Sequence, residues 1–125
     1  MYELFLSICL MTSLNCSDVN VEYYRLPFDT HAIAAIDIRG DYHILVDPSV
    51  KKQKSHRQRN IMIHEIAHLL VYEIDPTNNT HNEVFDEVCE ELSEVFEVRP
   101  NKVCSQHSGE PSYWHPHTHY KRDRG

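Results

Sequence analysis

The sequence predicts an α+β domain, and three patterns carry this prediction. Apolar and polar residues alternate at residues 19–23, and residues 32–47 have the pattern of a β-hairpin around Arg39-Gly40-Asp41, so we expect a small antiparallel sheet. Residues 56–74 and 80–100 carry apolar residues at helical spacing. The short loop between them makes two packed, antiparallel helices the expected arrangement.

The length of 125 residues is enough for one domain with one modest core. After Pro100 the apolar pattern ends, and Ser, Pro, Gly and His become frequent. We therefore predict a single domain at residues 1–100 and a disordered, His-rich tail at residues 101–125. Histidines of this tail, such as those at 115, 117 and 119, are expected to bind metal ions only weakly without a packed scaffold.

The first sixteen residues are apolar and raise the question of a signal peptide. No Lys or Arg precedes the apolar run, which carries Glu3 instead, so an N-terminal helix and a cytoplasmic location are favoured over secretion. The four cysteines, at 9, 16, 89 and 104, form no CxxC pair and have no regular spacing. We expect reduced thiols, with Cys89 in the core.

The charge of the chain limits the classes of partner. A net charge of −7 argues against a nucleic-acid-binding protein, because a phosphate backbone attracts clustered Lys and Arg. No stretch after the first helix reaches the length of a membrane span. We expect neither nucleic acid nor a membrane as a partner.

Each of the two predicted helices is preceded by the signature of a capping box. Ser55 with Gln58 predicts a helix start at about His56, and Thr80 with Glu83 predicts the start of the next helix. The apolar stripe of this second helix continues until Pro100.

The first of these helices carries the pattern HEIAH at residues 64–68. His64 and His68 are four residues apart, so both imidazoles stand on one helix face and can reach one metal ion. Glu65 follows the first histidine and is placed to take a proton from water beside the metal. We predict a zincin-like site with one Zn²⁺ per chain.

A third protein ligand is needed to leave one coordination position open. The second helix offers several acidic residues, of which Asp86 and Glu87 lie on the two flanks of its apolar stripe. Glu91, nearer the edge of the stripe, and His81, on the apolar face, remain alternatives. The sequence leaves the choice among these four open.

These residues predict a zinc metallopeptidase that hydrolyses a peptide bond by a zinc-activated water, with Glu65 as general base. The expected substrate is a peptide or protein held in extended form along a sheet edge, for which the strand at residues 42–46 is the candidate. The alternative from another class is a regulatory or structural module that binds zinc and cleaves nothing.

The order of hairpin, capped HEIAH helix, short loop and acidic helix resembles the ImmA/IrrE-type HExxH metallopeptidases and their small phage-encoded relatives, over about residues 19–100. In that family a Glu in the pattern E-x-x-A-N-x-F-A completes the zinc site. Placing Leu92-Ser93 at the F-A positions puts Asp86 in the ligand position, with Glu87 next to it. The resemblance implies a regulatory target in a bacterial or phage setting.

Overall fold

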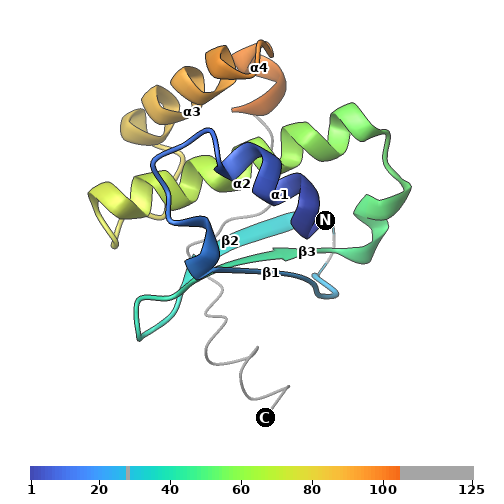
Figure 1. The fold of residues 1–125 in the computed structure, drawn as a ribbon, viewed down its shortest axis with the longest axis horizontal. Coiled ribbons are helices and arrows are strands. Elements are labelled where there is room, and N and C mark those ends of the chain that lie inside the picture. Colours follow the sequence, from blue (N-terminus) through green and yellow to red (C-terminus); the bar gives the residue numbers. More distant parts are fainter. Residues whose placement is uncertain (28, 105–125) are drawn as a thin grey trace.

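The computed structural model describes residues 1–27 and 29–104, and a three-stranded sheet lies at its base (Figure 1). The strands are β1 (Val19–Tyr23), β2 (Ala32–Ile36) and β3 (Tyr42–Val46). β2 and β3 form the predicted antiparallel hairpin, whose turn places Gly40 at a φ of 86°. The predicted α+β class is confirmed.

The sheet is mixed, because β1 pairs with β3 in parallel and the order across the sheet is β1-β3-β2. After β1 the chain passes the end of β3, where the amide of Tyr24 donates to the carbonyl of Val46. β1 and β2 are therefore not adjacent, and β3 lies between them. The prediction that β3 offers a free edge is therefore wrong, because β3 is the middle strand, and within the part of the chain that the structure describes β1 and β2 are the edge strands.

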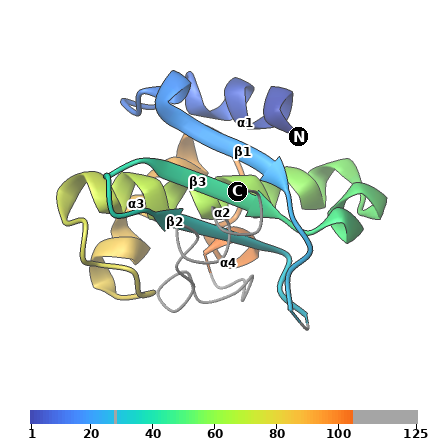
Figure 2. The same ribbon diagram turned by 90° about the horizontal axis from the view of Figure 1, so that it is seen from below.

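The helices form layers on one side of the sheet. They are α1 (Tyr2–Cys9), α2 (Ser55–Ile74), α3 (Glu83–Val95) and the one-turn α4 (Pro100–Val103), with short 3-10 segments at Cys16–Asp18 and Pro48–Lys52. α2 packs across the sheet, and α3 and α4 pack on α2 from the opposite side (Figure 1). Figure 2 shows α1 beside β1, along one flank of α2. α2 is thus buried between layers.

Both helix starts differ from the predicted capping boxes. α2 begins at Ser55 itself after Lys54, and the Gln58 side chain donates to the carbonyl of Gln53 at 2.9 Å. α3 begins at Glu83, and the Asn82 side chain accepts from the amide of Phe85 at 3.2 Å. The three-residue capping geometry is present at α3, but Asn82 provides it two residues after the predicted cap.

The core lies between α2 and the sheet and continues between α2 and the outer helices. α2 is buried at every residue from Ile61 to Leu69. The other face of the sheet carries a smaller buried group with Leu26, Ile33, Ala35 and Leu45. None of the helices in the described residues has the length and apolar character needed to cross a membrane.

The folded chain continues past the predicted boundary at Pro100. Val103 is fully buried, and Cys104 forms a disulfide with Cys89 on α3. A second disulfide joins Cys9 to Cys16. The prediction of reduced thiols is therefore wrong: each pair is brought together by the fold, which irregular spacing in the sequence does not reveal. Residues 105–125 of the predicted tail lie outside the described residues.

Asp37 and His43 form a buried polar pair beside the turn between β2 and β3. The Asp37 carboxylate contacts Nε2 of His43 at 2.8 Å, and both side chains are at most 1% exposed. It also accepts from the amides of Arg39 and Asp41 at 2.9 and 3.0 Å. Burial opposes ionisation of Asp37, but the bonds from His43 and the two amides lower its pKa below the usual value of 3.8.

We expect Asp37→Asn to lower the free energy of unfolding at neutral pH by about 1–3 kcal/mol, because the buried oxygen that faces His43 becomes an amide NH₂ and the negative charge is lost, although the oxygen that accepts from the two amides remains. Since the folded pKa lies below 3.8, the contribution of Asp37 is fully present above that pH and is lost as the pH falls through the folded value. Urea unfolding of the metal-free protein at neutral pH and at about pH 3 checks both statements.

The matched control is Asp41→Asn, which changes an exposed carboxylate that meets Arg39 at only 3.8 Å. Its effect should stay within about 0.5 kcal/mol. Equal effects of the two substitutions, or an Asp37→Asn effect that does not shrink at low pH, would contradict the account of this pair.

Candidate metal centre

Three histidines from two segments meet beside α3. His64 and His68 lie one turn apart on α2, and His81 comes from the loop that joins α2 to α3. Nε2 of His81 lies 3.1 Å from Nε2 of His64 and 3.0 Å from Nε2 of His68. Within residues 1–27 and 29–104 this is the group of ligand-type side chains whose geometry could hold a metal ion.

The distances between the imidazoles fit a shared metal ion. Tetrahedral zinc with Zn–N bonds of 2.0–2.1 Å requires ligand nitrogens about 3.3 Å apart, and the two measured separations lie within a few tenths of an ångström of this value. A single proton on His81 would have to be shared between two acceptors to explain the same contacts. The donor set of three imidazoles therefore suits a metal such as zinc.

The protonation states of the two α2 histidines favour metal binding. Nδ1 of His64 lies 2.8 Å from the carbonyl oxygen of Val103, which only accepts, so Nδ1 carries the proton and Nε2 faces the cluster with its lone pair. Burial, followed by the nearby imidazoles of His64 and His81, lowers the pKa of His68 well below its usual value. His68 is therefore neutral, which is the form that binds a metal.

Phe85 forms the apolar wall of the cluster. Its ring centroid lies 5.0 Å from that of His64, 4.3 Å from that of His68 and 4.9 Å from that of His81. The side chain is fully buried in the first turn of α3. The Asn82 cap that starts α3 thus places Phe85 against all three imidazoles and limits their rotation.

Glu65 lies between α2 and the sheet and is 1% exposed. Its carboxylate accepts a hydrogen bond from the backbone amide of Ala34 in β2, while Oε2 has no hydrogen-bond partner among the described residues. Burial raises the pKa of Glu65 to about 8, and the bond from Ala34 opposes this rise. A buried carboxyl with one open oxygen is costly for stability and typical of a functional group.

Both backbone groups of Ala34, its amide and its carbonyl, bond to side chains of α2. The amide of Asp37 donates to Asp41 and the amide of Asp47 donates to His31, so the odd-numbered residues of β2 pair with β3. The backbone groups of Ala34 consequently point to the outer edge. There the amide meets Glu65, and the carbonyl accepts from the hydroxyl of Tyr72 at 3.3 Å.

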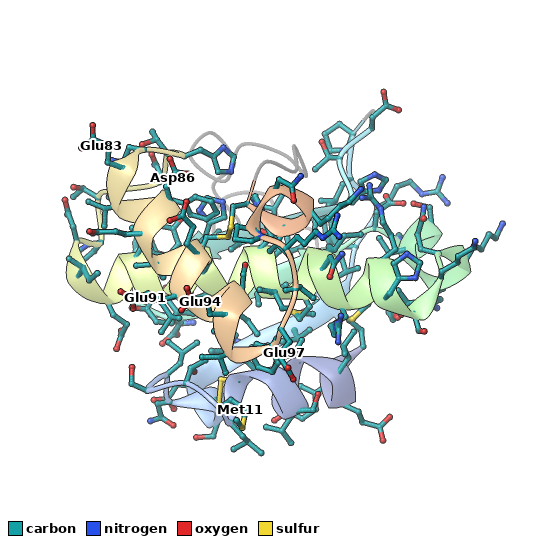
Figure 3. The ribbon with its side chains drawn as sticks, turned by 90° about the horizontal axis from the view of Figure 1, so that it is seen from above. Met11, Glu83, Asp86, Glu91, Glu94 and Glu97 are labelled. Atoms are coloured by element: carbon teal, nitrogen blue, oxygen red, sulfur yellow. A yellow bond between two sulfur atoms is a disulfide. The ribbon has the colours of Figure 1, made fainter. Side chains whose placement is uncertain are left out.

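The acidic candidates for a third ligand lie elsewhere. Asp86, Glu87 and Glu91 are exposed, and Figure 3 shows Asp86 and Glu91 on α3 with Glu83 and Glu94. Because Phe85 faces the histidines, the next two residues turn away from them on the helix. The structure brings His81, rather than Asp86 or Glu87, to His64 and His68. The available sequence signal was the place of His81 four residues before Phe85, on the apolar side.

Comparison with known proteins places this geometry in a family. The SprT-like family matches residues 18–107. In the crystal structure of the metallopeptidase zymogen of Pyrococcus abyssi abylysin, the matched chain is 23% identical with a TM-score of 0.50, over 77% of this chain and 91% of that one. This likeness shows a shared fold.

No curated protein matches the chain. The ImmA/IrrE-type assignment, which rests on the HEIAH helix, is not what the family comparison finds. The family match includes β1, both histidines of α2, His81 and α4, and it spans well over half of the sequence. The chain belongs to the SprT-like family.

Proposed function

We propose that this protein is a zinc-dependent metallopeptidase in which His64, His68 and His81 hold the ion and Glu65 is the general base. The observation that carries the proposal is that the imidazole of His81 meets those of His64 and His68 on α2, the helix that also carries the buried Glu65. Membership of the SprT-like family and the fold shared with a metallopeptidase zymogen support it.

In the proposed reaction the histidines hold the zinc, and Glu65 transfers the proton. Zinc, when bound, supplies a Lewis acid that brings the pKa of a water toward neutrality and polarises a carbonyl. Glu65 accepts the proton of the attacking water and passes it to the leaving amine. Its pKa of about 8 in the metal-free protein favours the neutral acid, but a nearby dication favours the carboxylate that a base requires.

The proposed substrate is an extended peptide lying along the outer edge of β2. β2 has a strand partner on only one side within the described residues, and α2 packs directly on it. Ala32 and Ile36 have the same outward orientation as Ala34, whose groups are already bonded to Glu65 and Tyr72. A peptide would hydrogen-bond to these two flanking residues.

A non-catalytic zinc-binding module remains the alternative, because the bond from Ala34 holds the Glu65 carboxylate against the strand. A cytoplasmic location and a phage-encoded origin stay predictions from the sequence. The two disulfides argue against the cytoplasm, since such bonds persist in oxidising compartments.

We expect the purified protein to bind one zinc per chain. His81→Ala should weaken zinc affinity by at least about 100-fold, because the loss of a direct ligand exceeds the loss of an outer hydrogen bond. His64→Ala and His68→Ala should act alike. Elemental analysis and chelator competition measure stoichiometry and affinity.

Asp86→Ala and Glu87→Ala are the matched controls for this experiment, since both side chains are exposed on α3. They should leave zinc affinity unchanged. Retention of zinc by His81→Ala together with its loss in either control would refute the ligand assignment.

We expect Glu65→Gln to keep zinc and to lower cleavage of an unfolded protein such as denatured casein by about 10²–10⁴-fold, the usual contribution of a positioned base. Glu83→Gln, an exposed change in α3, should cleave like the wild type. Peptide release measured by mass spectrometry checks the rates. A wild type that binds zinc but cleaves nothing supports the non-catalytic module, and equal cleavage by Glu65→Gln excludes its role as base.

A further inference from the structure

The carbonyl of Val103 orients a histidine of the metal centre from a distant part of the chain. It accepts the proton of His64 Nδ1 at 2.8 Å, although 39 residues separate the two. Outer hydrogen bonds of this kind hold a ligating imidazole in one tautomer and one ring orientation. The hydrogen bond to Val103 therefore helps to fix where Nε2 of His64 points.

Val103 is held by its burial against α2 and α3 and, through the next residue, by a disulfide. α4 has four residues, and a single helical turn is not stable on its own. The disulfide between Cys89 and Cys104 ties the residue next to Val103 to the middle of α3. Ser93 supports this junction, because its hydroxyl donates to the carbonyl of Cys89 at 2.8 Å and lies 3.6 Å from Sγ of Cys104.

We propose that the Cys89–Cys104 disulfide is a redox-sensitive latch that keeps the metal centre in its binding geometry. It rests on the proposed metal site of His64, His68 and His81. In the oxidised protein the latch holds Val103 against His64. Reduction frees α4, removes the acceptor of His64 Nδ1 and weakens metal binding by about 10- to 100-fold, the usual effect of losing an outer hydrogen bond.

The chemistry of the latch is thiol–disulfide exchange with a dithiol. A thiolate of the dithiol attacks Sγ of Cys104, which is half-buried, whereas Cys89 is fully buried. The bond between the two cysteines breaks as a mixed disulfide forms, and the second thiol of the dithiol then releases Cys104. The dithiol leaves as its own disulfide, and Cys89 and Cys104 each end as a thiol.

The chain contains a matched control for this latch. The Cys9–Cys16 disulfide links the end of α1 to the segment before β1, and none of its residues contacts the three histidines through a hydrogen bond or ring contact found in the described residues. Cys9 ends α1, which lies on one flank of α2, whereas the latch joins α3 to the end of α4 (Figure 1). Removal of the Cys9–Cys16 disulfide should leave metal affinity unchanged.

The test uses the full chain with Cys9→Ala and Cys16→Ala, so that one disulfide remains. Zinc affinity is measured by chelator competition in the oxidised protein, after reduction by a dithiol that is then removed without air, and after reoxidation. We expect the 10- to 100-fold loss on reduction and its recovery on reoxidation. The Cys89→Ala, Cys104→Ala double variant should match the reduced form if it folds.

A second readout follows His64 directly. Long-range proton–nitrogen NMR of the metal-free protein should show the Nδ1–H tautomer of His64 in the oxidised state and a mixture of tautomers after reduction. A general loss of stability would not select this one ring. Equal zinc affinity and an unchanged His64 tautomer in both redox states would overturn the latch while leaving the proposed function intact. Absence of zinc binding in the oxidised wild type would overturn both.

Discussion

The burial of three polar side chains in the middle of α2 is the constraint on which the rest of the structure depends. His64, Glu65 and His68 are each at most 1% exposed, and a buried polar group without a partner costs about 1–3 kcal/mol. Each receives its partner from a different segment. Val103 of α4 meets His64, Ala34 of β2 meets Glu65, and His81 of the loop reaches His68. The strand, the loop and the end of the described chain are thereby all directed to one helix.

Much of this arrangement could be predicted from the sequence because it depends on local patterns. The alternation at β1, the hairpin of β2 and β3, and the end of α2 before Pro76 follow from periodicity and turn residues. HEIAH placed two of the three histidines because a spacing of four is fixed by helix geometry. The fold class could be predicted because it follows from these local patterns.

What the sequence did not reveal depends on contacts between distant residues. The parallel pairing of β1 with β3 depends on how the chain turns back after β1, which no periodicity of the sequence describes. The two disulfides depend on which helices pack together. His81 was left as an alternative because the neighbouring helix has many acidic residues, and only the ring contacts of the folded protein show that Phe85, rather than Asp86 or Glu87, faces the centre. The prediction of a domain end at Pro100 overlooked Val103 for the same reason.

The position of β3 in the sheet has a consequence for how the chain folds as it leaves the ribosome. Among the described residues β3 is the last strand along the chain but the middle one in the sheet, so β1 and β2 have no strand there to pair with until it emerges. β3 can pair with β2 through the short turn at residues 37–41, whereas its pairing with β1 must close the chain from Val19 to Tyr42. Until β3 emerges, the N-terminal segment carries two unpaired strands, of which β2 is entirely apolar, and this is the stage at which the protein is most exposed to aggregation.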